Sequence, residues 1–400
     1  MNYNVANCLK YVRSSVPLSS TYCNEPWRTV HYDEQGRLGP CCTFRGQRSL
    51  DTTVEEYWNG TWLRDFRTSL LNGERPRGCR NCWAKEDRGE SSQRTEKNNK
   101  HGYVSDANIH ELFLSFGNIC NKTCNICRPQ RSHLIAKEYR QIPQDNEWLQ
   151  EKIKQQPKVM GSLNKDFSGR YLSRIEDYFT ALQSADVIHL DGGEPFIVSQ
   201  CDEILDYMIS NNMTDKHIKA TTNGSVNRSQ LEKLAQFSQV SFHLSIDGVD
   251  DLYELVRPPH DWQWWCKQHN QIREYDFHIT YATVAHAFNV HQLPEILEYM
   301  IANSRTHGNT NAYISQLNNQ EYLGCDVVPE SVIYKTVWKL ERMDIPAHMQ
   351  NNVKNIINHL NKAASINNDS NKKYFDLYME TFGPIKKILY SNYIPWITND

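Results

Sequence analysis

The sequence predicts an α/β protein: a partial (β/α)6 TIM-type barrel with a small cysteine-rich metal-binding domain at the N-terminus and a helical C-terminal extension. Three observations predict it. Strand-like and helix-like segments alternate between residues 111 and 317, five cysteines cluster between residues 20 and 85, and the pattern from about 329 to 392 is mostly helical. A β-then-α rhythm favours parallel strands joined by right-handed crossovers.

The length of 400 residues is enough for one large domain and a smaller one. A polar stretch that is almost free of large apolar residues is typical of a linker. The expected segments are the cysteine-rich domain at 20–85, the linker at 86–108, the barrel at 109–320 and the C-terminal extension at 321–400.

The predicted strands are short and rich in β-branched or aromatic residues. They are expected at 111–117, 186–190, 217–222, 240–246, 278–284 and 311–317. The clearest helical patterns lie around 131–140, 170–184, 200–211, 228–237, 261–274 and 291–303. In barrels of this kind the loops after the strands carry the chemistry, so polar residues at the strand ends have more weight than residues within helices.

Composition excludes several classes of function. A formal net charge of -3 gives no basic field of the kind that nucleic-acid binders use, so no nucleic acid is expected as a partner. The first 20 residues lack the apolar core of a signal peptide and no apolar run is long enough to span a bilayer, so we expect a cytoplasmic protein without a membrane partner. In a reducing compartment the twelve cysteines are expected to be metal ligands or buried thiols.

Three cysteines lie within eight residues directly after the first predicted strand: Cys120, Cys124 and Cys127. Three thiols on one loop can face a single point. A structural zinc site and most iron–sulfur clusters take four protein ligands, so a set of three leaves one coordination position open for a substrate or cofactor. A zinc site remains the alternative.

This Cys-x3-Cys-x2-Cys spacing resembles the signature of the radical S-adenosylmethionine (SAM) superfamily, and the resemblance spans roughly residues 110–320. It implies an enzyme whose 4Fe–4S cluster binds SAM at its open iron and cleaves it reductively to a 5′-deoxyadenosyl radical, which abstracts hydrogen from a substrate. It also implies an electron donor such as flavodoxin or ferredoxin. Ile126 departs from the family, which usually carries an aromatic residue just before the third cysteine.

A Gly-Gly-Glu-Pro segment follows the second predicted strand and contains Gly192, Gly193 and Glu194. Paired glycines let the backbone approach a ligand closely, and a carboxylate can accept hydrogen bonds from an ammonium group. The similar segment of the family binds the methionine amino group of SAM. The resemblance therefore implies that contact for Glu194.

The third, fourth and fifth predicted strands also end in polar or cofactor-like segments, although each one alone could be a plain turn. In this order they resemble the cofactor-contacting strands of the family. The resemblance implies that Ser245 and Asp247 reach the ribose or the methionine carboxylate, with Asn223 nearby, and that Val284 lends backbone groups to adenine. Arg257 could offer a fork to a carboxylate or could be a solvated surface arginine.

A second cysteine group lies in the N-terminal region and consists of Cys23, Cys41, Cys79 and Cys82, with Cys42 as an alternative to Cys41. Four ligands from two separated segments suit a closed metal site. Four thiols alone would serve iron–sulfur or zinc equally well.

The first half of this group, a cysteine followed after twelve residues by Gly36 and after four more by a cysteine, is similar to the opening of SPASM and Twitch domains. Those domains are auxiliary-cluster modules of many radical enzymes, so the similarity implies a second 4Fe–4S cluster. There are two departures. Arg88 stands where the full SPASM pattern has a further cysteine, and the module precedes the barrel instead of following it.

A barrel signature combined with a Twitch-like module is typical of peptide maturases, so the resemblance implies an oxidoreductase that modifies a peptide or protein side chain. Two alternatives stay open: a radical SAM enzyme acting on a small molecule or nucleotide, and a noncatalytic zinc or iron–sulfur protein. Three tryptophans, Trp262, Trp264 and Trp265, could line a substrate pocket, but a helix packed on the barrel core explains them more simply.

Overall fold

The computed structural model describes residues 19–46, 52–104, 106–155, 175–304, 310–317, 320–366 and 368–397. The start of the chain, where no signal peptide is expected, and residues 170–174 of a predicted helix lie outside the described residues. By its contacts the chain divides into two units. The first consists of the chain up to residue 30 together with 38–109, and the second of 31–37 together with 110–400.

The first unit is mostly helical around a small aromatic core. Its core side chains are Tyr22, Cys23, Trp27, Leu70 and Trp83. Its elements are α1 (Glu25–Arg28), β2 (Leu38–Gly39), α2 (Val54–Asn59), α3 (Thr61–Leu71), a 3-10 turn η2 (Arg77–Cys79), α4 (Arg80–Glu86) and α5 (Gln93–His101); β1 (Thr29–Tyr32) begins in this unit and ends in the second.

The structure corrects the prediction of a linker at 86–108, because α5 forms within it. Ser92 caps this helix by accepting a hydrogen bond from the backbone of Thr95, and Gly102 ends it with a φ of 66°. No residue of α5 is buried, so the helix has no apolar stripe from which it could have been predicted. Its side chains hold it to the rest of the unit through hydrogen bonds instead.

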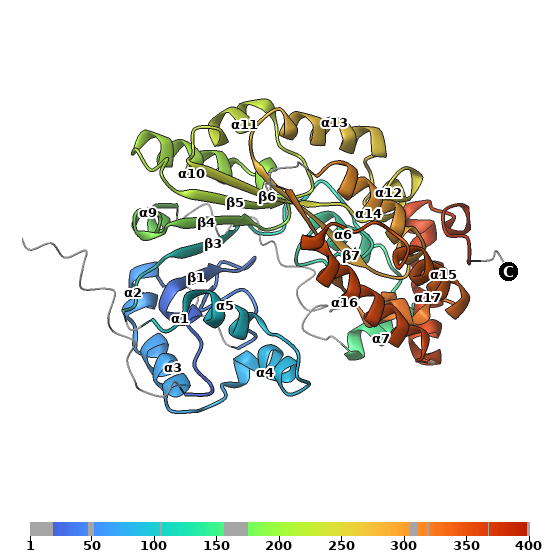
Figure 1. The fold of residues 1–400 in the computed structure, drawn as a ribbon, viewed down its shortest axis with the longest axis horizontal. Helices are drawn as coiled ribbons and strands as arrows, with labels where there is room; N and C mark the ends of the chain where they lie inside the picture. Colours follow the sequence, from blue (N-terminus) through green and yellow to red (C-terminus); the bar gives the residue numbers. More distant parts are fainter. Residues whose placement is uncertain are drawn as a thin grey trace, which may run out of the picture. The chain divides into compact units, whose positions relative to one another are not determined.

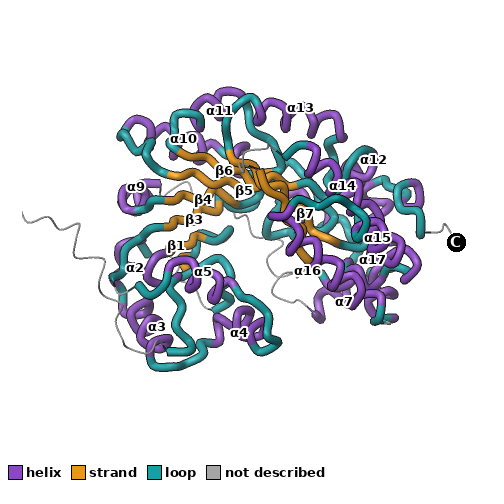
Figure 2. The backbone as a smooth tube through the Cα atoms, in the orientation of Figure 1, coloured by secondary structure: helices purple, strands orange, loops and turns teal. Residues whose placement is uncertain are grey.

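The second unit contains six parallel strands that follow one another in the sheet in chain order (Figures 1 and 2). They are β3 (Glu111–Ser115), β4 (Val187–Asp191), β5 (His217–Thr222), β6 (Gln239–Ser245), β7 (His278–Ala285) and β8 (Thr310–Gln316). Each pairs with the next in parallel register, for example Ser115 with Asp191 and Ser245 with Ala282. The predicted alternation of six parallel strands with helices is confirmed.

The helices of this unit fall where the sequence pattern places them. They are α6 (His133–Tyr139), α9 (Ile175–Ser184), α10 (Ser199–Ser210), α11 (Arg228–Leu234), α13 (Trp262–Arg273) and α14 (Leu293–Ala302). Two further helices, α7 (Glu147–Gln155) and α12 (Asp251–Val256), were not predicted. Figure 1 shows α10, α11 and α13 along one side of the strands.

Three helices after the last strand make up the helical C-terminal segment: α15 (Glu330–Leu340), α16 (Ala347–Ala364) and α17 (Asp369–Lys386). Helix α16 packs on β8, where the side-chain amide of Asn352 accepts from the backbone N–H of Ile314 at 2.8 Å and donates to its carbonyl at 3.0 Å. Helices α7 and α17 meet around the fully buried Trp148, which stacks on Tyr374.

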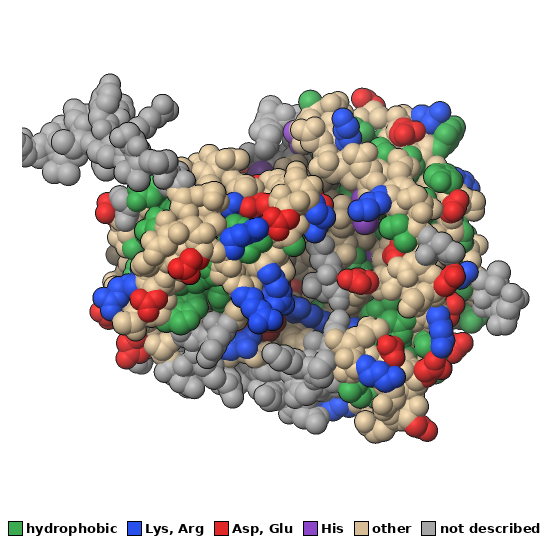
Figure 3. Space-filling view, turned by 90° about the horizontal axis from the view of Figure 1, so that it is seen from below, with side chains coloured by type: hydrophobic (Ala, Val, Ile, Leu, Met, Phe, Trp, Pro, Cys, Tyr) green, Lys and Arg blue, Asp and Glu red, His purple; other side chains and the backbone are tan. Residues whose placement is uncertain are grey.

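The distribution of charged side chains and the apolar character of the helices can be compared with the sequence-based expectations. On the face shown in Figure 3, basic and acidic side chains lie interspersed. Among the helices of the described residues, none combines the length and the apolar character required to cross a bilayer.

Candidate functional site

A cavity of about 290 Å³ lies in the second unit at the carboxyl ends of the parallel strands. Its wall contains the three cysteines of the Cys120 loop and all eight residues that the sequence predicted to bind the cofactor. These are Cys120, Cys124, Cys127, Gly192, Gly193, Glu194, Asn223, Ser245, Asp247, Arg257 and Val284. The structure therefore brings together residues that are up to 164 positions apart in the sequence.

The cysteine loop follows β3 and is pinned by its own hydrogen bonds and by the segment after α12. The hydroxyl of Ser132 donates to the carbonyl of Lys122 at 2.8 Å. The backbone N–H of Thr123 donates to the carbonyl of Pro258 at 2.9 Å, and that of Asn125 donates to the carbonyl of Val256 at 3.1 Å. These bonds fix the loop backbone before any ligand is bound.

The thiols of this loop lie close to one another, with Cys120 buried and Cys124 and Cys127 half-buried. Burial and the neighbouring Cys124 together raise the pKa of Cys127 to about 11. Burial and both neighbouring thiols likewise raise the pKa of Cys120. Thiols with a raised pKa ionise readily only when a bound cation compensates their charge, which is the chemistry of a metal-ligand set.

The spacing of the thiols bears on which metal would fit. Among the described residues, no three or more Cys, His, Asp or Glu side chains surround a single ion position. In an iron–sulfur cluster each thiolate binds a different iron, so the thiols stand farther apart than around one zinc ion. A cluster and a zinc ion thus make different demands on the positions of the three thiols of the Cys120 loop.

Two glycines bring the loop after β4 against the cysteine loop. The backbone N–H of Gly193 donates to the carbonyl of Gly117 at 2.9 Å, and a Cβ on Gly193 would lie 2.1 Å from the carbonyl oxygen of Ile119. Gly192 has a φ of 136°, a region that favours glycine. The close approach that glycine allows here is to the cysteine loop, whereas the sequence interpretation placed it at a ligand.

Glu194 is 1% exposed and its carboxylate points to the end of β5. One carboxylate oxygen accepts from the hydroxyl of Thr222 at 2.7 Å, and the other accepts from the backbone N–H of Asn223 at 2.7 Å. Burial raises the pKa of Glu194 to about 7, although these hydrogen bonds act in the opposite direction. A nearby cation would favour the ionised carboxylate.

Asp247 and Arg257 form a buried ion pair in the wall of the cavity. The second carboxylate oxygen of Asp247 accepts from the backbone N–H of Val284 at 2.9 Å. The side-chain amide of Asn289 donates to the backbone carbonyls of Asp247 and Val284. Arg257 is 9% exposed, so the alternative of a solvated surface arginine is wrong. Asp247 therefore binds both Arg257 and Val284, two other residues predicted to contact the cofactor. The sequence did not indicate these contacts.

Asn223 and Ser245 take different positions at the wall. The side-chain amide of Asn223 donates to Asn121, the residue directly after Cys120, at 2.9 Å. Its oxygen accepts from the hydroxyl of Ser225 at 2.6 Å. Ser245 is the last residue of β6 and lines the cavity.

Two basic residues of this wall were missed by the sequence reasoning. Arg131 binds Asp191 at 2.9 Å and lies 3.8 Å from Glu34, and despite the opposing effect of burial it holds the pKa of Asp191 below its usual range. Lys122 lies between the first two cysteines of the loop and lines the cavity. Because both residues lie within or just after the cysteine motif, their positions in the sequence could have identified them as candidates for the site.

The three tryptophans of α13 are not equivalent. Trp265 is fully buried and Trp262 stacks on it, as expected of a helix packed on the core. The ring of Trp264 instead lies 4.3 Å from the Nζ of Lys122. This tryptophan thus belongs to the surroundings of the cysteine loop.

The N-terminal cysteines lie together within the first unit. Burial raises the pKa of Cys23, and the thiols of Cys41 and Cys79 raise it further. Burial and the thiol of Cys82 raise the pKa of Cys79 to about 12. These electrostatic effects connect Cys23 with Cys41 and Cys79, and Cys79 with Cys82. Cys42 donates instead to the side chain of Gln93 at 3.4 Å.

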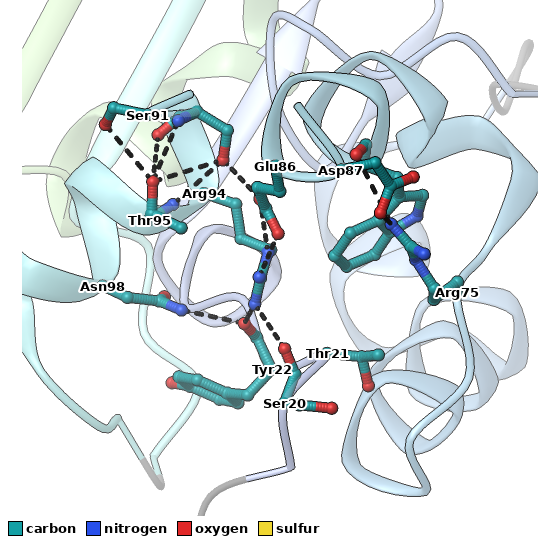
Figure 4. A network of polar contacts seen from close by, with 12 residues as sticks. Ser20, Thr21, Tyr22, Arg75, Glu86, Asp87, Ser91, Arg94, Thr95 and Asn98 are labelled. Atoms are coloured by element: carbon teal, nitrogen blue, oxygen red, sulfur yellow. Dashed lines mark hydrogen bonds and ion pairs between the residues drawn. The ribbon is translucent and has the colours of Figure 1, made fainter. Parts of the chain in front are cut away.

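A network centred on Arg94 of α5 connects the two cysteine-bearing segments of this unit (Figure 4). Arg94 donates to the carbonyls of Ser20 and Tyr22 at 3.0 and 2.7 Å, directly before Cys23. It also binds Glu86 at the end of α4, the helix that carries Cys82. The helix that replaces the predicted linker therefore organises the cysteine group.

Residues 114–300 match the model of the Radical SAM superfamily. This range contains the Cys120 loop, the Gly-Gly-Glu-Pro segment and the ends of β5, β6 and β7. The match agrees with the resemblance that the cysteine spacing indicated, and it covers a little under half of the chain. A comparison with curated protein sequences finds no match.

Solved structures show remote similarity to the chain. The protein anSMEcpe with bound AdoMet is 12% identical, with a TM-score of 0.37, over 57% of this chain and 58% of that chain. SuiB of Streptococcus suis bound to S-adenosylmethionine is 15% identical, with a TM-score of 0.34, over 66% of this chain and 53% of that chain. The chain thus spans a little over half the length of these proteins, and similarity at this level assigns no substrate.

Proposed function

We propose that this chain, whose core is a radical SAM domain, is an enzyme that cleaves SAM reductively to a 5′-deoxyadenosyl radical and uses the radical to abstract hydrogen from a substrate. One observation carries the proposal. A single cavity is lined by three adjacent thiols, by the buried Glu194 and by the polar ends of the following strands. Three thiols without a fourth leave a coordination position for a ligand, and the carboxylate and amide groups around it suit a zwitterionic one.

In this proposal Cys120, Cys124 and Cys127 hold a 4Fe–4S cluster. When bound, the cluster supplies the electron that cleaves SAM. Glu194 accepts a hydrogen bond from the amino group of SAM, because Thr222, Asn223 and the backbone N–H of Phe196 hold its carboxylate in place and leave one acceptor position unused.

The far side of the cavity receives the nucleoside. Asp247 orients Val284, whose neighbouring backbone groups contact adenine, while Ser245 and Asn223 contact the ribose side. Arg257 acts mainly by holding Asp247 in place, since its guanidinium already binds that carboxylate. Burial of this wall excludes water, which strengthens each of these polar contacts.

A second 4Fe–4S cluster is proposed for Cys23, Cys41, Cys79 and Cys82. Cys41 is proposed as the ligand because its thiol raises the pKa of Cys23, with the adjacent Cys42 as the alternative. Together with the radical SAM core, such a module supports a peptide or protein side chain as the substrate. A flavodoxin or ferredoxin would deliver the electrons.

The test is release of 5′-deoxyadenosine from SAM by anaerobically reconstituted protein in the presence of dithionite, measured by liquid chromatography and mass spectrometry. The wild-type protein and the control Cys201→Ala, whose thiol is buried in α10 outside both cysteine groups, should release it. Cys127→Ala should not.

Two results would contradict the proposal. One is the absence of 5′-deoxyadenosine from protein with a full complement of iron. The other is stoichiometric zinc in protein purified anaerobically, which would favour the noncatalytic alternative. Incubation of an active preparation with candidate peptides, followed by mass spectrometry, then distinguishes a peptide substrate from a small molecule.

A further inference from the structure

Lys122 is a fully buried lysine that lines the proposed SAM cavity. It stands between Cys120 and Cys124, so its position is set by the loop that carries the cysteines. An ammonium group has three hydrogens to donate. Within the described part of the chain, its Nζ has one acceptor, the carbonyl of Arg257, at the long distance of 3.5 Å.

Two aromatic rings also lie close to this ammonium group. The Nζ of Lys122 lies 4.3 Å from the ring of Trp264 and 5.1 Å from the ring of Tyr253. Such contacts attract a cation and hold it in place. They provide no lone pair for the remaining hydrogens of the ammonium group.

The carboxylates of the same wall already have partners of their own. Asp191 binds Arg131, and Asp247 binds Arg257. Glu194 accepts from Thr222 and from the backbone of Asn223. No ion pair between Lys122 and a carboxylate occurs among the residues that the structure describes.

A buried ammonium without a counter-charge is costly unless an anion compensates it. Burial lowers the pKa of Lys122, whereas the thiols of Cys124 and Cys120 and the carboxylate of Glu194 raise it. Lys122 and Glu194 both line the same cavity. In a bound amino acid, the carboxylate is attached to the carbon that carries the amino group. A ligand that places its amino group at Glu194 therefore brings its carboxylate to the neighbouring wall.

We propose that Lys122 binds the carboxylate of SAM, with Trp264 and Tyr253 holding its ammonium group toward the cavity. This inference rests on the proposed function. It assigns the carboxylate contact to a residue of the cysteine loop, whereas Arg257 is engaged by Asp247.

The test compares SAM with decarboxylated SAM, an analogue that keeps the amino group and lacks the carboxylate. Dissociation constants are measured anaerobically by equilibrium dialysis on reconstituted wild-type, Lys122→Met and Lys122→Arg proteins. Methionine fills a similar volume and packs well against aromatic rings. The control is Lys137→Met, the same change at an exposed lysine of α6.

Lys122→Met should weaken the binding of SAM by roughly 10- to 100-fold, the range expected for a charged hydrogen bond. It should change the binding of decarboxylated SAM by less than about twofold, because that ligand lacks the group that Lys122 contacts. Lys122→Arg keeps a cation and should retain most of the preference for SAM. Lys137→Met should bind both ligands like the wild type.

Equal weakening of both ligands by Lys122→Met, or no weakening of either, would overturn the inference. So would a shift of the cluster's midpoint potential with unchanged discrimination, since Lys122 would then serve the charge of the cluster. If Lys122→Met fails to retain iron, Lys122→Arg decides: full iron without preference for SAM contradicts the inference. Wild-type protein that has full iron and binds neither ligand contradicts the proposed function itself.

Discussion

The backbone N–H of Glu194 donates a 2.8 Å hydrogen bond to the carbonyl oxygen of Ile119, one residue before the first cysteine of the loop. This bond joins the residue proposed to bind the amino group of SAM to the loop proposed to hold the cluster. Gly193 makes it possible, because a side chain at that position would collide with the same carbonyl. Cluster and ligand contacts thus depend on one backbone junction.

Replacing Gly193 tests this junction. Gly193→Ala places a Cβ 2.1 Å from the carbonyl oxygen of Ile119, so the two loops must separate. We expect a loss of about 1–3 kcal/mol in stability, as for other overpacked sites, together with less iron in the Cys120 site. Thermal unfolding and iron analysis measure both effects. Gly89→Ala is the control for the iron content: its φ of 75° strains an alanine, but no atom lies within 4 Å of the new Cβ, so the Cys120 site should keep its iron. Equal loss of iron from the two variants would refute the steric argument.

The ion pair of Asp247 and Arg257 gives a second expectation, because each partner is buried. Arg257→Met leaves a buried carboxylate without its cation and should cost about 3–5 kcal/mol of stability. The double variant Asp247→Asn with Arg257→Met should cost clearly less than the sum of the single changes. Thermal unfolding measures the cycle, with the exposed Arg228→Met as control. Additive losses would show that the pair does not act as a unit.

Arg94 provides an expectation for the N-terminal cysteines. Arg94→Met removes the bonds to the carbonyls of Ser20 and Tyr22 and to Glu86, so the segments carrying the cysteines should separate. Reconstituted protein should then fall from about eight to about four iron atoms per chain. The control Arg88→Met breaks only an exposed pair with Glu90 and should keep the full iron content. Full iron in Arg94→Met would contradict the positioning role.

A buried histidine should make stability depend on pH. Burial lowers the pKa of His286 from 6.5 to about 4 in the folded protein. The unfolded chain therefore binds a proton first as the pH falls, so the stability that His286 contributes is present above 6.5 and is lost toward pH 4. Between pH 7 and pH 5 the loss is about 2 kcal/mol. Thermal unfolding across this range should show a smaller decline for His286→Gln, and parallel curves for the two proteins would refute the assignment.

The strands of the second unit could be predicted because their apolar and β-branched residues give a local signal. β5 was predicted with the bounds that the structure has, His217–Thr222. Helix α5 could not be predicted in the same way, because its stability comes from the Ser92 cap and from hydrogen bonds to Tyr22, which is more than 70 residues away. Such contacts leave no periodic pattern in the sequence.

The residues of the candidate site could be predicted as a set, but their contacts with one another could not. Motif order along the chain placed Glu194, Asp247 and Val284 at strand ends, and parallel strands bring those ends together. Which groups pair within the cavity depends on side-chain distances. For that reason the sequence assigned Asp247 and Arg257 to the ligand, gave no role to Lys122, and interpreted Trp264 as core.

The electron paramagnetic resonance spectrum of the dithionite-reduced protein, recorded with and without SAM, tests the central claim most directly. A Cys79→Ala variant, which lacks one of the N-terminal thiols, keeps the signal of the Cys120 site separate from that of the second group. The account expects a 4Fe–4S signal whose g-values change when SAM is added, because SAM binds at the open iron. A cluster signal that SAM leaves unchanged, in protein with full iron at this site, would contradict the account.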